Sequence, residues 1–289
     1  MGPELAGAII ALVALGVGLG ILTALGVTRA SSTMLPAVGL AYVVGLAAIG
    51  LPTLVLLSAG VTVNLLTVAL VALAVGAIAW IAGLRRAAAP TGARDRERPE
   101  WTRLDRAAVI AFLAGLVAVA IVGGMAASVT PLSHWDAWSI WGRKAVLLTH
   151  WTTLPVSFFK HSSSGMQSPD YPLLLPLIES VHLRLVGTTS LRPAQLELWL
   201  LAIGSAGALA YLGARLTRPL VWAPVVLCTV VAPGLYRNLV GGYADAAMAA
   251  FLGPGVLLLG IWLRSPRART LALATLLLAA AASTKDEGL

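Results

Sequence analysis

Uninterrupted apolar runs constrain this chain more than any other feature of its sequence. About eight runs of about 20 residues consist almost entirely of aliphatic and small side chains. A helix of that length crosses the roughly 30 Å hydrocarbon core of a bilayer and satisfies its backbone hydrogen bonds internally. The runs do not alternate with a period of two, as the strands of a membrane barrel would. The sequence therefore predicts an all-α polytopic membrane protein.

The predicted spans are spread along the whole chain of 289 residues, of which 58% are hydrophobic and 11% charged. They are residues 5–27, 35–57, 63–83, 107–128, 196–213, 220–236, 244–263 and 268–284. The run at 171–187 is shorter and carries Glu179, His182 and Arg184, which a bilayer would bury at high cost. We expect it to be an additional helix that lies in the outer interface or re-enters and returns.

Basic residues beside the span ends predict the orientation of the helices. Arg85 and Arg86 open an arginine-rich segment, 85–106, which the positive-inside rule places in the cytoplasm with the connections that contain Arg215 and Arg267. The amino terminus and the remaining polar connections then lie together on the outer side. The formal net charge of +8 is therefore explained by orientation, without a nucleic-acid-binding surface.

The arginine-rich segment also divides the chain. Residues 1–84 form a predicted amino-terminal membrane module of three helices without visible chemistry, residues 85–106 a cytoplasmic basic linker, and residues 107–289 the membrane region with the polar loops. Charged residues follow the last run directly, so we expect the polypeptide to continue beyond Leu289. The lone Cys228 lies in an apolar run, and neither an internal disulfide nor a cysteine metal site is expected.

The loop at 131–171 concentrates tryptophan, histidine and charge. Asp136 is its early carboxylate, with Trp135, Trp138 and Trp141 close by in sequence. If this stretch is α-helical, positions 138 and 141 share a face that can lie on lipid, while Asp136 points into a cavity. A carboxylate so placed can take a proton from an attacking hydroxyl as general base. A plain interfacial tryptophan belt with a solvated acid is the alternative, and the residues leave both open.

Cations on the same predicted side are candidates for holding a phosphate, which Arg binds through two nitrogens and Lys as a point charge. The candidate phosphate-binding residues are Arg143, Lys144, Arg237 and Lys285. Attraction to anionic lipid headgroups explains the same charges equally well. Asp245, at the outer entrance of a span, needs a partner, and Arg237 is the predicted one.

Histidine spacing does not indicate a metal centre. His150 and His161 have no carboxylate at a helical pairing distance, and the sequence has no phosphate loop, nucleophile elbow or zinc-protease motif. Glu179 and His182 share a face of their predicted helix and are explained by a polar stripe on an interfacial helix. No cofactor is expected, and the dependence on a metal stays open.

The order of these short motifs resembles the GT-C class of membrane glycosyltransferases, and most of all its protein mannosyltransferase and aminoarabinose transferase branch. The shared features are an acid in the first large outer loop, a helix start at Tyr171-Pro172-Leu173-Leu174-Leu175-Pro176-Leu177, Arg237 before Asp245, and Thr284-Lys285-Asp286-Glu287-Gly288. The resemblance runs from about Ala107 to the end. Ala137 stands where the family often has a second acid, and Leu173 replaces a second proline.

The resemblance implies a fold and an activity. A GT-C-like enzyme moves a sugar from a polyprenyl-phosphate donor to an acceptor hydroxyl on the extracytoplasmic face of a membrane, here expected to be a bacterial plasma membrane, usually with inversion. Asp136 matches the base and Lys285 the lysine near the donor phosphate. The residues assigned to the cavity and the acceptor are Tyr171, Asp245, Glu287 and His161.

The expected partners are the lipid-linked sugar, membrane lipid and an acceptor that is a glycan, a lipid or a protein, with no nucleic acid. Two other functions stay open from the sequence. One is a polytopic transporter or lipid flippase, for which charged or broken spans at mid-membrane would be typical. The other is a non-catalytic membrane subunit or fragment.

Overall fold

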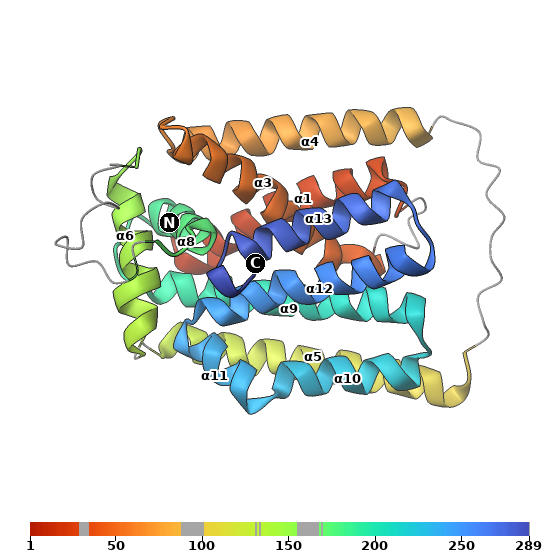
Figure 1. The fold of residues 1–289 in the computed structure, drawn as a ribbon. Coiled ribbons are helices and arrows are strands. Elements are labelled where there is room, and N and C mark those ends of the chain that lie inside the picture. Colours follow the sequence, from red (N-terminus) through yellow and green to blue (C-terminus); the bar gives the residue numbers. More distant parts are fainter. Residues whose placement is uncertain are drawn as a thin grey trace.

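The computed structural model describes residues 1–28, 35–87, 101–130, 132, 134–154, 168 and 170–288. Within these ranges every regular element is a helix. The long helices run side by side, and the short helix α6 lies across one end of the bundle (Figure 1). Six helices are long and apolar enough to cross a membrane, or up to seven if one bent pair counts as a single span. The predicted class, an all-α polytopic membrane protein, is confirmed at this level.

The six candidate spans are α1 (Pro3–Ala24), α3 (Val38–Ser58), α4 (Leu65–Ala87), α5 (Arg103–Val129), α9 (Arg192–Leu216) and α12 (Ala244–Arg264). The bent pair is α10 (Pro219–Val231) and α11 (Pro233–Gly241). The shorter elements are η1 (Leu35–Ala37), η2 (Ala137–Gly142), α6 (Arg143–His150), α8 (Leu174–Val186), α13 (Ala268–Ala282) and η4 (Asp286–Gly288).

Two of the predicted spans look different in the structure. The run at 220–236 bends by 48° between α10 and α11, because Pro233 lacks an amide hydrogen and its ring excludes a continuous helix. The last run forms α13, whose 15 residues rise only about 22 Å, less than a typical hydrocarbon core. The segment at 171–187 forms α8, which is not among the candidate spans of the described chain.

Basic residues tie the helix ends together at the end of the bundle opposite α6. Arg218, just before α10, pairs with Asp105 of α5 at 2.7 Å. Arg269 of α13 donates to the carbonyl of Leu25 at 3.3 Å, just after α1. Side chains from regions far apart in sequence thus lie at one end, as the grouping of the basic connections predicts.

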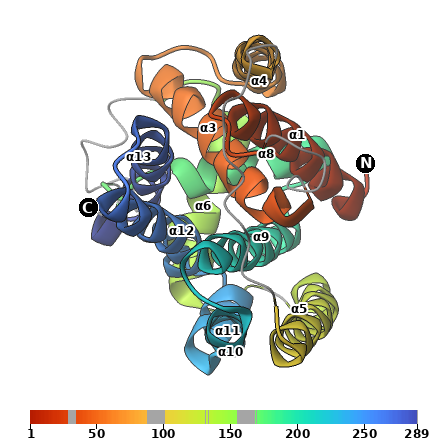
Figure 2. The same ribbon diagram turned by 90° about the vertical axis from the view of Figure 1, so that its right-hand side faces the viewer.

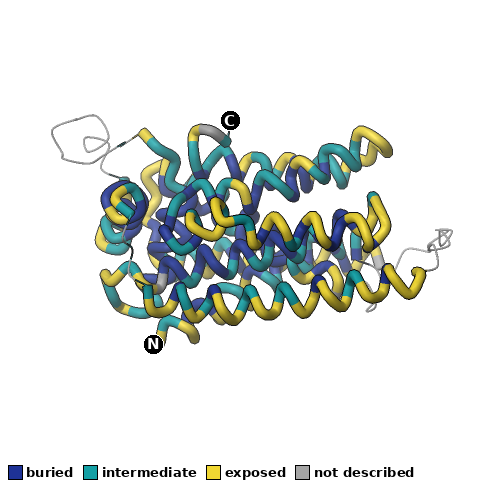
Figure 3. The backbone as a smooth tube through the Cα atoms, turned by 90° about the horizontal axis from the view of Figure 1, so that it is seen from below, coloured by how far each residue is buried: buried dark blue, intermediate teal, exposed yellow. Residues whose placement is uncertain are grey.

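Helix α3 is the most buried of the candidate spans, and α4 and α5 lie on opposite sides of the bundle (Figure 2). A Cβ on Gly18 of α1 would overlap the backbone of Ala41, and one on Gly45 of α3 would overlap the backbone of Ala14. These glycines let the two helix backbones touch, which is how membrane helices gain close packing without a hydrophobic driving force. Helix α5 presents a largely exposed surface (Figure 3), and both α4 and α5 expose large apolar side chains, such as Leu73 and Val122, as lipid contact requires.

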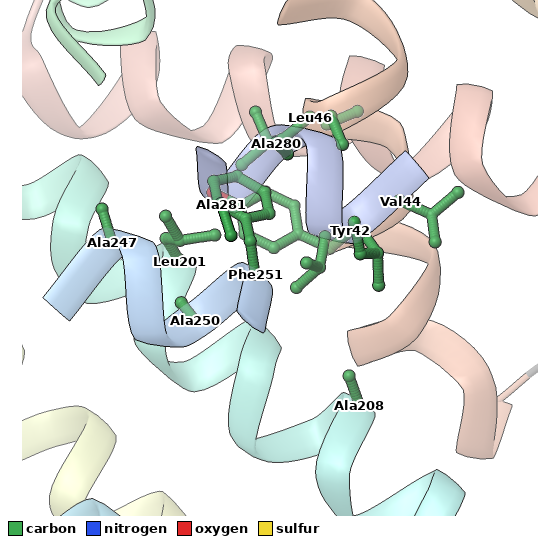
Figure 4. Packing of buried hydrophobic residues seen from close by; sticks show 14 of the residues in the cluster. Tyr42, Val44, Leu46, Leu201, Ala208, Ala247, Ala250, Phe251, Ala280 and Ala281 are labelled. Atoms are coloured by element: carbon green, nitrogen blue, oxygen red, sulfur yellow. The ribbon is translucent and has the colours of Figure 1, made fainter. Parts of the chain in front are cut away.

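The main hydrophobic core joins the amino-terminal helices to the later ones. Tyr42 and Leu46 of α3 pack near Leu201 of α9, Phe251 of α12 and Ala281 of α13 (Figure 4). Ala14 and Leu22 of α1 belong to the same core, so two of the three amino-terminal helices, α1 and α3, share a core with the region that carries the polar loops.

Candidate functional site

The segment before η2 packs against the connection between α11 and α12 at the α6 end of the bundle. The rings of His134 and Tyr243 lie 5.2 Å apart. Gly242 has φ +77°, and a Cβ there would overlap the Leu132 side chain and lie 3.2 Å from the Cβ of Ala137. Only glycine fits both this conformation and this approach. Asp136, which lies between His134 and Ala137, is thereby brought close to the start of α12.

Asp136 is half-buried and directly precedes η2, and it makes no side-chain cap. The prediction that positions 138 and 141 share a lipid-facing side is wrong, because Trp138 is 48% exposed and Trp141 only 2%. The reason is that η2 is a π-helix, in which hydrogen bonds run from i to i+5 and the α-helical spacing of faces no longer holds. Such π-helical turns are frequent at functional sites.

Asp245 lies in the first turn of α12 and forms an ion pair with Lys285, which follows α13. The distance between Lys285 Nζ and Asp245 Oδ1 is 2.7 Å. The expected pairing of Asp245 with Arg237 is wrong, because Asp245 pairs with Lys285 and Arg237 is exposed on α11. The return of α13 alongside α12 brings the lysine to the acid, although the two residues are 40 positions apart.

Lys144 is buried inside an aromatic clamp at the same end. Its Nζ donates to the carbonyl of Ser168 at 2.7 Å and to that of Tyr171 at 2.9 Å. It lies 5.7 Å from the ring centres of both Trp141 and Tyr171, which stack 5.4 Å apart. Burial lowers the pKa of Lys144 to about 8, against the opposing effect of Asp170 and then Asp286. The ammonium thus orders the backbone that leads into α8.

A backbone hydrogen bond connects the Lys144 clamp with the ion pair. The amide of Leu174, at the start of α8, donates to the carbonyl of Ser283 at 3.0 Å, and Ser283 is two residues before Lys285. The structure therefore gathers Asp136, Lys144, Tyr171, Asp245 and Lys285 at one end of the bundle.

The other predicted site residues are exposed, or their side chains lie outside the described structure. Arg143 is exposed on α6 and Arg237 on α11. Glu287 lies in η4, but its side chain is outside the described part of the structure, and His161 lies outside the described residues altogether.

A buried polar cluster behind α8 was missed by the sequence reasoning. Tyr42 of α3 donates to Glu197 Oε1 of α9 at 3.0 Å, and His182 Nδ1 of α8 lies 3.2 Å from Glu197 Oε2. Glu179 and His182 are 2% and 0% exposed, so the predicted interfacial polar stripe is wrong. The available signal was Glu197 itself, a carboxylate at the start of an otherwise apolar membrane helix.

Two apolar hollows flank these polar groups. One, of about 300 Å³, lies between α1, α3, α4 and α8 and includes Leu177 and Ile178 in its wall. The other, of about 650 Å³, is lined by α1, α3, α5 and α9 and reaches Tyr42. Asp136, Asp245 and Lys285 line neither hollow.

Among the described residues, no group of three or more His, Cys, Asp and Glu side chains is arranged to hold a metal ion. No protein-family model, curated protein or solved structure matches the chain.

Proposed function

We propose that this chain is a membrane glycosyltransferase of the GT-C type, which transfers a sugar from a polyprenyl-phosphate donor to an acceptor hydroxyl at the extracytoplasmic face of a bacterial plasma membrane. The observation that supports it most is the packing of the Asp136 segment against the residues just before Asp245, which is itself paired with Lys285. Asp136 makes no salt bridge in the described structure, and it lies at the same end of the bundle as Lys285. We call this end of the bundle, with Asp136, Tyr171, Asp245 and Lys285, the rim.

In this mechanism the acceptor oxygen attacks the anomeric carbon in a single displacement. The hydroxyl proton passes to the Asp136 carboxylate, the bond between that carbon and the phosphate oxygen breaks, and polyprenyl phosphate leaves with its electron pair. Lys285, with Arg143 and Arg237 on the same rim, stabilises the negative charge that develops on the phosphate. Lys144 holds the carbonyl of Tyr171 and so acts as a positioning residue in this proposal.

The route of the donor fits an enzyme without a nucleotide pocket. A lipid-linked sugar approaches sideways through the bilayer, so its prenyl chain needs an apolar hollow near the polar rim. Helix α8 begins three residues after Tyr171 and places Leu177 and Ile178 in the wall of the hollow between α1, α3, α4 and α8. The same short helix therefore joins the rim to a space suited to a hydrocarbon chain.

The test is transfer of radiolabelled sugar from polyprenyl-phosphate donors by the purified protein in proteoliposomes. Asp136→Asn should lower the rate by about 10²- to 10⁴-fold, the usual contribution of a general base, while the variant still inserts and folds. Glu4→Gln, which neutralises an exposed carboxylate in the first turn of α1, is the matched control and should keep full activity. Retained transfer by Asp136→Asn would remove Asp136 from the mechanism, and no transfer by the wild type from any such donor would count against the function.

A transporter or lipid flippase is the second candidate, and the buried carboxylates Glu179 and Glu197 favour it. Ionisable groups buried in membrane proteins commonly mark ion or substrate pathways. Proton flux or lipid translocation in the same proteoliposomes, without sugar transfer, would support this candidate over the enzyme.

A further inference from the structure

Four helices bring the buried polar cluster together. Glu179 and His182 come from α8, Glu197 from α9 and Tyr42 from α3, while α1 supplies the carbonyl of Pro3. The side chains of Glu179, His182 and Glu197 are at most 2% exposed. Charges so deeply buried must be compensated by a partner or by a proton.

The hydrogen bonds of His182 fix the number of protons that it shares with Glu197. Its Nε2 lies 3.0 Å from the carbonyl oxygen of Pro3, which only accepts, so Nε2 carries a hydrogen. Its Nδ1 lies 3.2 Å from Glu197 Oε2. Either Nδ1 donates to an ionised carboxylate, or Glu197 is protonated and donates to Nδ1. In both cases the pair holds one proton more than a neutral histidine beside an ionised glutamate, and its net charge is zero.

Glu179 is the group in this cluster that lacks compensation. Its Oε2 atom is buried and has no hydrogen-bond partner in the described structure. Nearby cations are directed elsewhere: Lys144 donates to the carbonyls of Ser168 and Tyr171. Arg184 donates to backbone carbonyls, which are those of Val63, Leu148 and Trp151.

The elements packed against α8 present few other charges to Glu179. Their titratable and charged groups at this end of the bundle are Glu4 of α1, Tyr42 of α3, Arg143, Lys144 and His150 of α6, and Arg192 and Glu197 of α9. Arg85 and Arg86 of α4 and Tyr211 and Arg215 of α9 lie at the opposite end, and η2 contributes none. Glu4, Arg143, His150 and Arg192 are exposed. Glu197 is paired with His182, so no cation of these helices is left to compensate a charge on Glu179, and burial favours its protonated form.

We infer that Glu179, Glu197 and His182 form a proton-binding site inside the bundle, with Glu179 as the group that binds and releases the exchangeable proton. The geometry favours a proton over a metal ion, because no three-ligand cluster exists among the described residues. With the proton bound, the whole cluster is neutral; when it leaves, one uncompensated negative charge stays between α8 and α9. Burial first, and then Glu197, raise the pKa of Glu179 to about 8, which agrees with this assignment.

Infrared difference spectroscopy of the full chain in lipid nanodiscs tests the inference. A carbonyl band of a buried protonated carboxyl should be present near pH 6 and disappear as the pH rises through about 8. Glu179→Gln should lack that band, whereas Glu4→Gln should keep it. A band that is lost near the ordinary glutamate pKa of 4.5, or a band that still disappears near pH 8 in Glu179→Gln, would overturn the assignment.

The thermal unfolding midpoint provides a second readout. Since folded Glu179 keeps its proton up to about pH 8 and the unfolded carboxyl releases it near pH 4.5, the wild-type unfolding midpoint should fall as the pH rises across that window. Glu179→Gln mimics the protonated side chain and should flatten this part of the profile, while an unchanged wild-type slope in the variant would count against the site. If Glu179→Gln does not fold, Glu179→Asp keeps a titrating carboxyl, and the infrared band should persist at a shifted pH; its absence in both proteins would overturn the inference.

Discussion

Lys285 Nζ lies 2.7 Å from Asp245 Oδ1, which joins the end of α13 to the first turn of α12. The acid also lies at a helix amino terminus, where the helix dipole favours a negative charge. Since Asp245 is 39% exposed and Lys285 14%, solvent screens the pair on one side. The contact joins Asp245, which the sequence analysis assigned to the cavity and the acceptor, to Lys285, which it assigned to the donor phosphate.

A double-mutant cycle should detect this ion pair. Asp245→Asn and Lys285→Met should each lower the free energy of unfolding, and the double variant should lose less than their sum, with a coupling of about 0.5–1 kcal/mol, as for a partly exposed pair. The coupling should shrink in high salt. Denaturant unfolding in detergent measures it, and strict additivity at low salt would show that the pair contributes nothing in solution.

The pH dependence of stability should reveal the buried Lys144. Its pKa is about 8 in the folded chain and 10.5 for the free side chain, so between these values the unfolded chain binds more protons than the folded one. The free energy of unfolding therefore rises with pH across this window. Lys144→Met should abolish that rise and cost about 2 kcal/mol near pH 7, because two carbonyls lose a charged donor.

The measurement is the thermal unfolding midpoint of the wild type and of Lys144→Met, followed from about pH 7 to pH 10.5. Arg143→Gln is the matched control on the same helix, since a guanidinium does not titrate in this range, and it should keep the wild-type slope. The same slope in Lys144→Met would mean that the ammonium is solvated and not clamped.

Gly242→Ala should displace the segment that carries Asp136. The left-handed φ of +77° costs a non-glycine residue about 1–2 kcal/mol, and the overlap with Leu132 adds to that cost. We expect a lower unfolding midpoint and, if the rim transfers sugar, a fall in the transfer rate that exceeds the loss of folded protein.

Gly234→Ala is the control for Gly242→Ala. Gly234 lies in the first turn of α11 with nothing within 4 Å of an added Cβ. Alanine there should be neutral or should raise the midpoint slightly, because it favours the helix more than glycine does. Equal effects of the two substitutions would argue against a close approach at Gly242.

The limits of the sequence-based prediction are clearest in helix α8. Its spacing correctly put Glu179 and His182 on one face, but an amphipathic helix has the same periodicity whether its polar face meets water or other buried polar groups. The partner of that face, Glu197, comes from a helix that begins after α8 and lies beside it only in the folded chain. The burial of Glu179 and His182 could therefore not be predicted from the spacing of residues within α8.

The sequence by itself determined the class of protein and the position of most helices, because the length of an apolar run and the need to satisfy its backbone in lipid are local properties. The tertiary structure alone decided that Lys285 and not Arg237 pairs with Asp245, that Lys144 donates to two carbonyls, and that η2 turns Trp141 inward. These outcomes depend on which helix ends lie within hydrogen-bonding distance, and that follows from the packing of all the helices together.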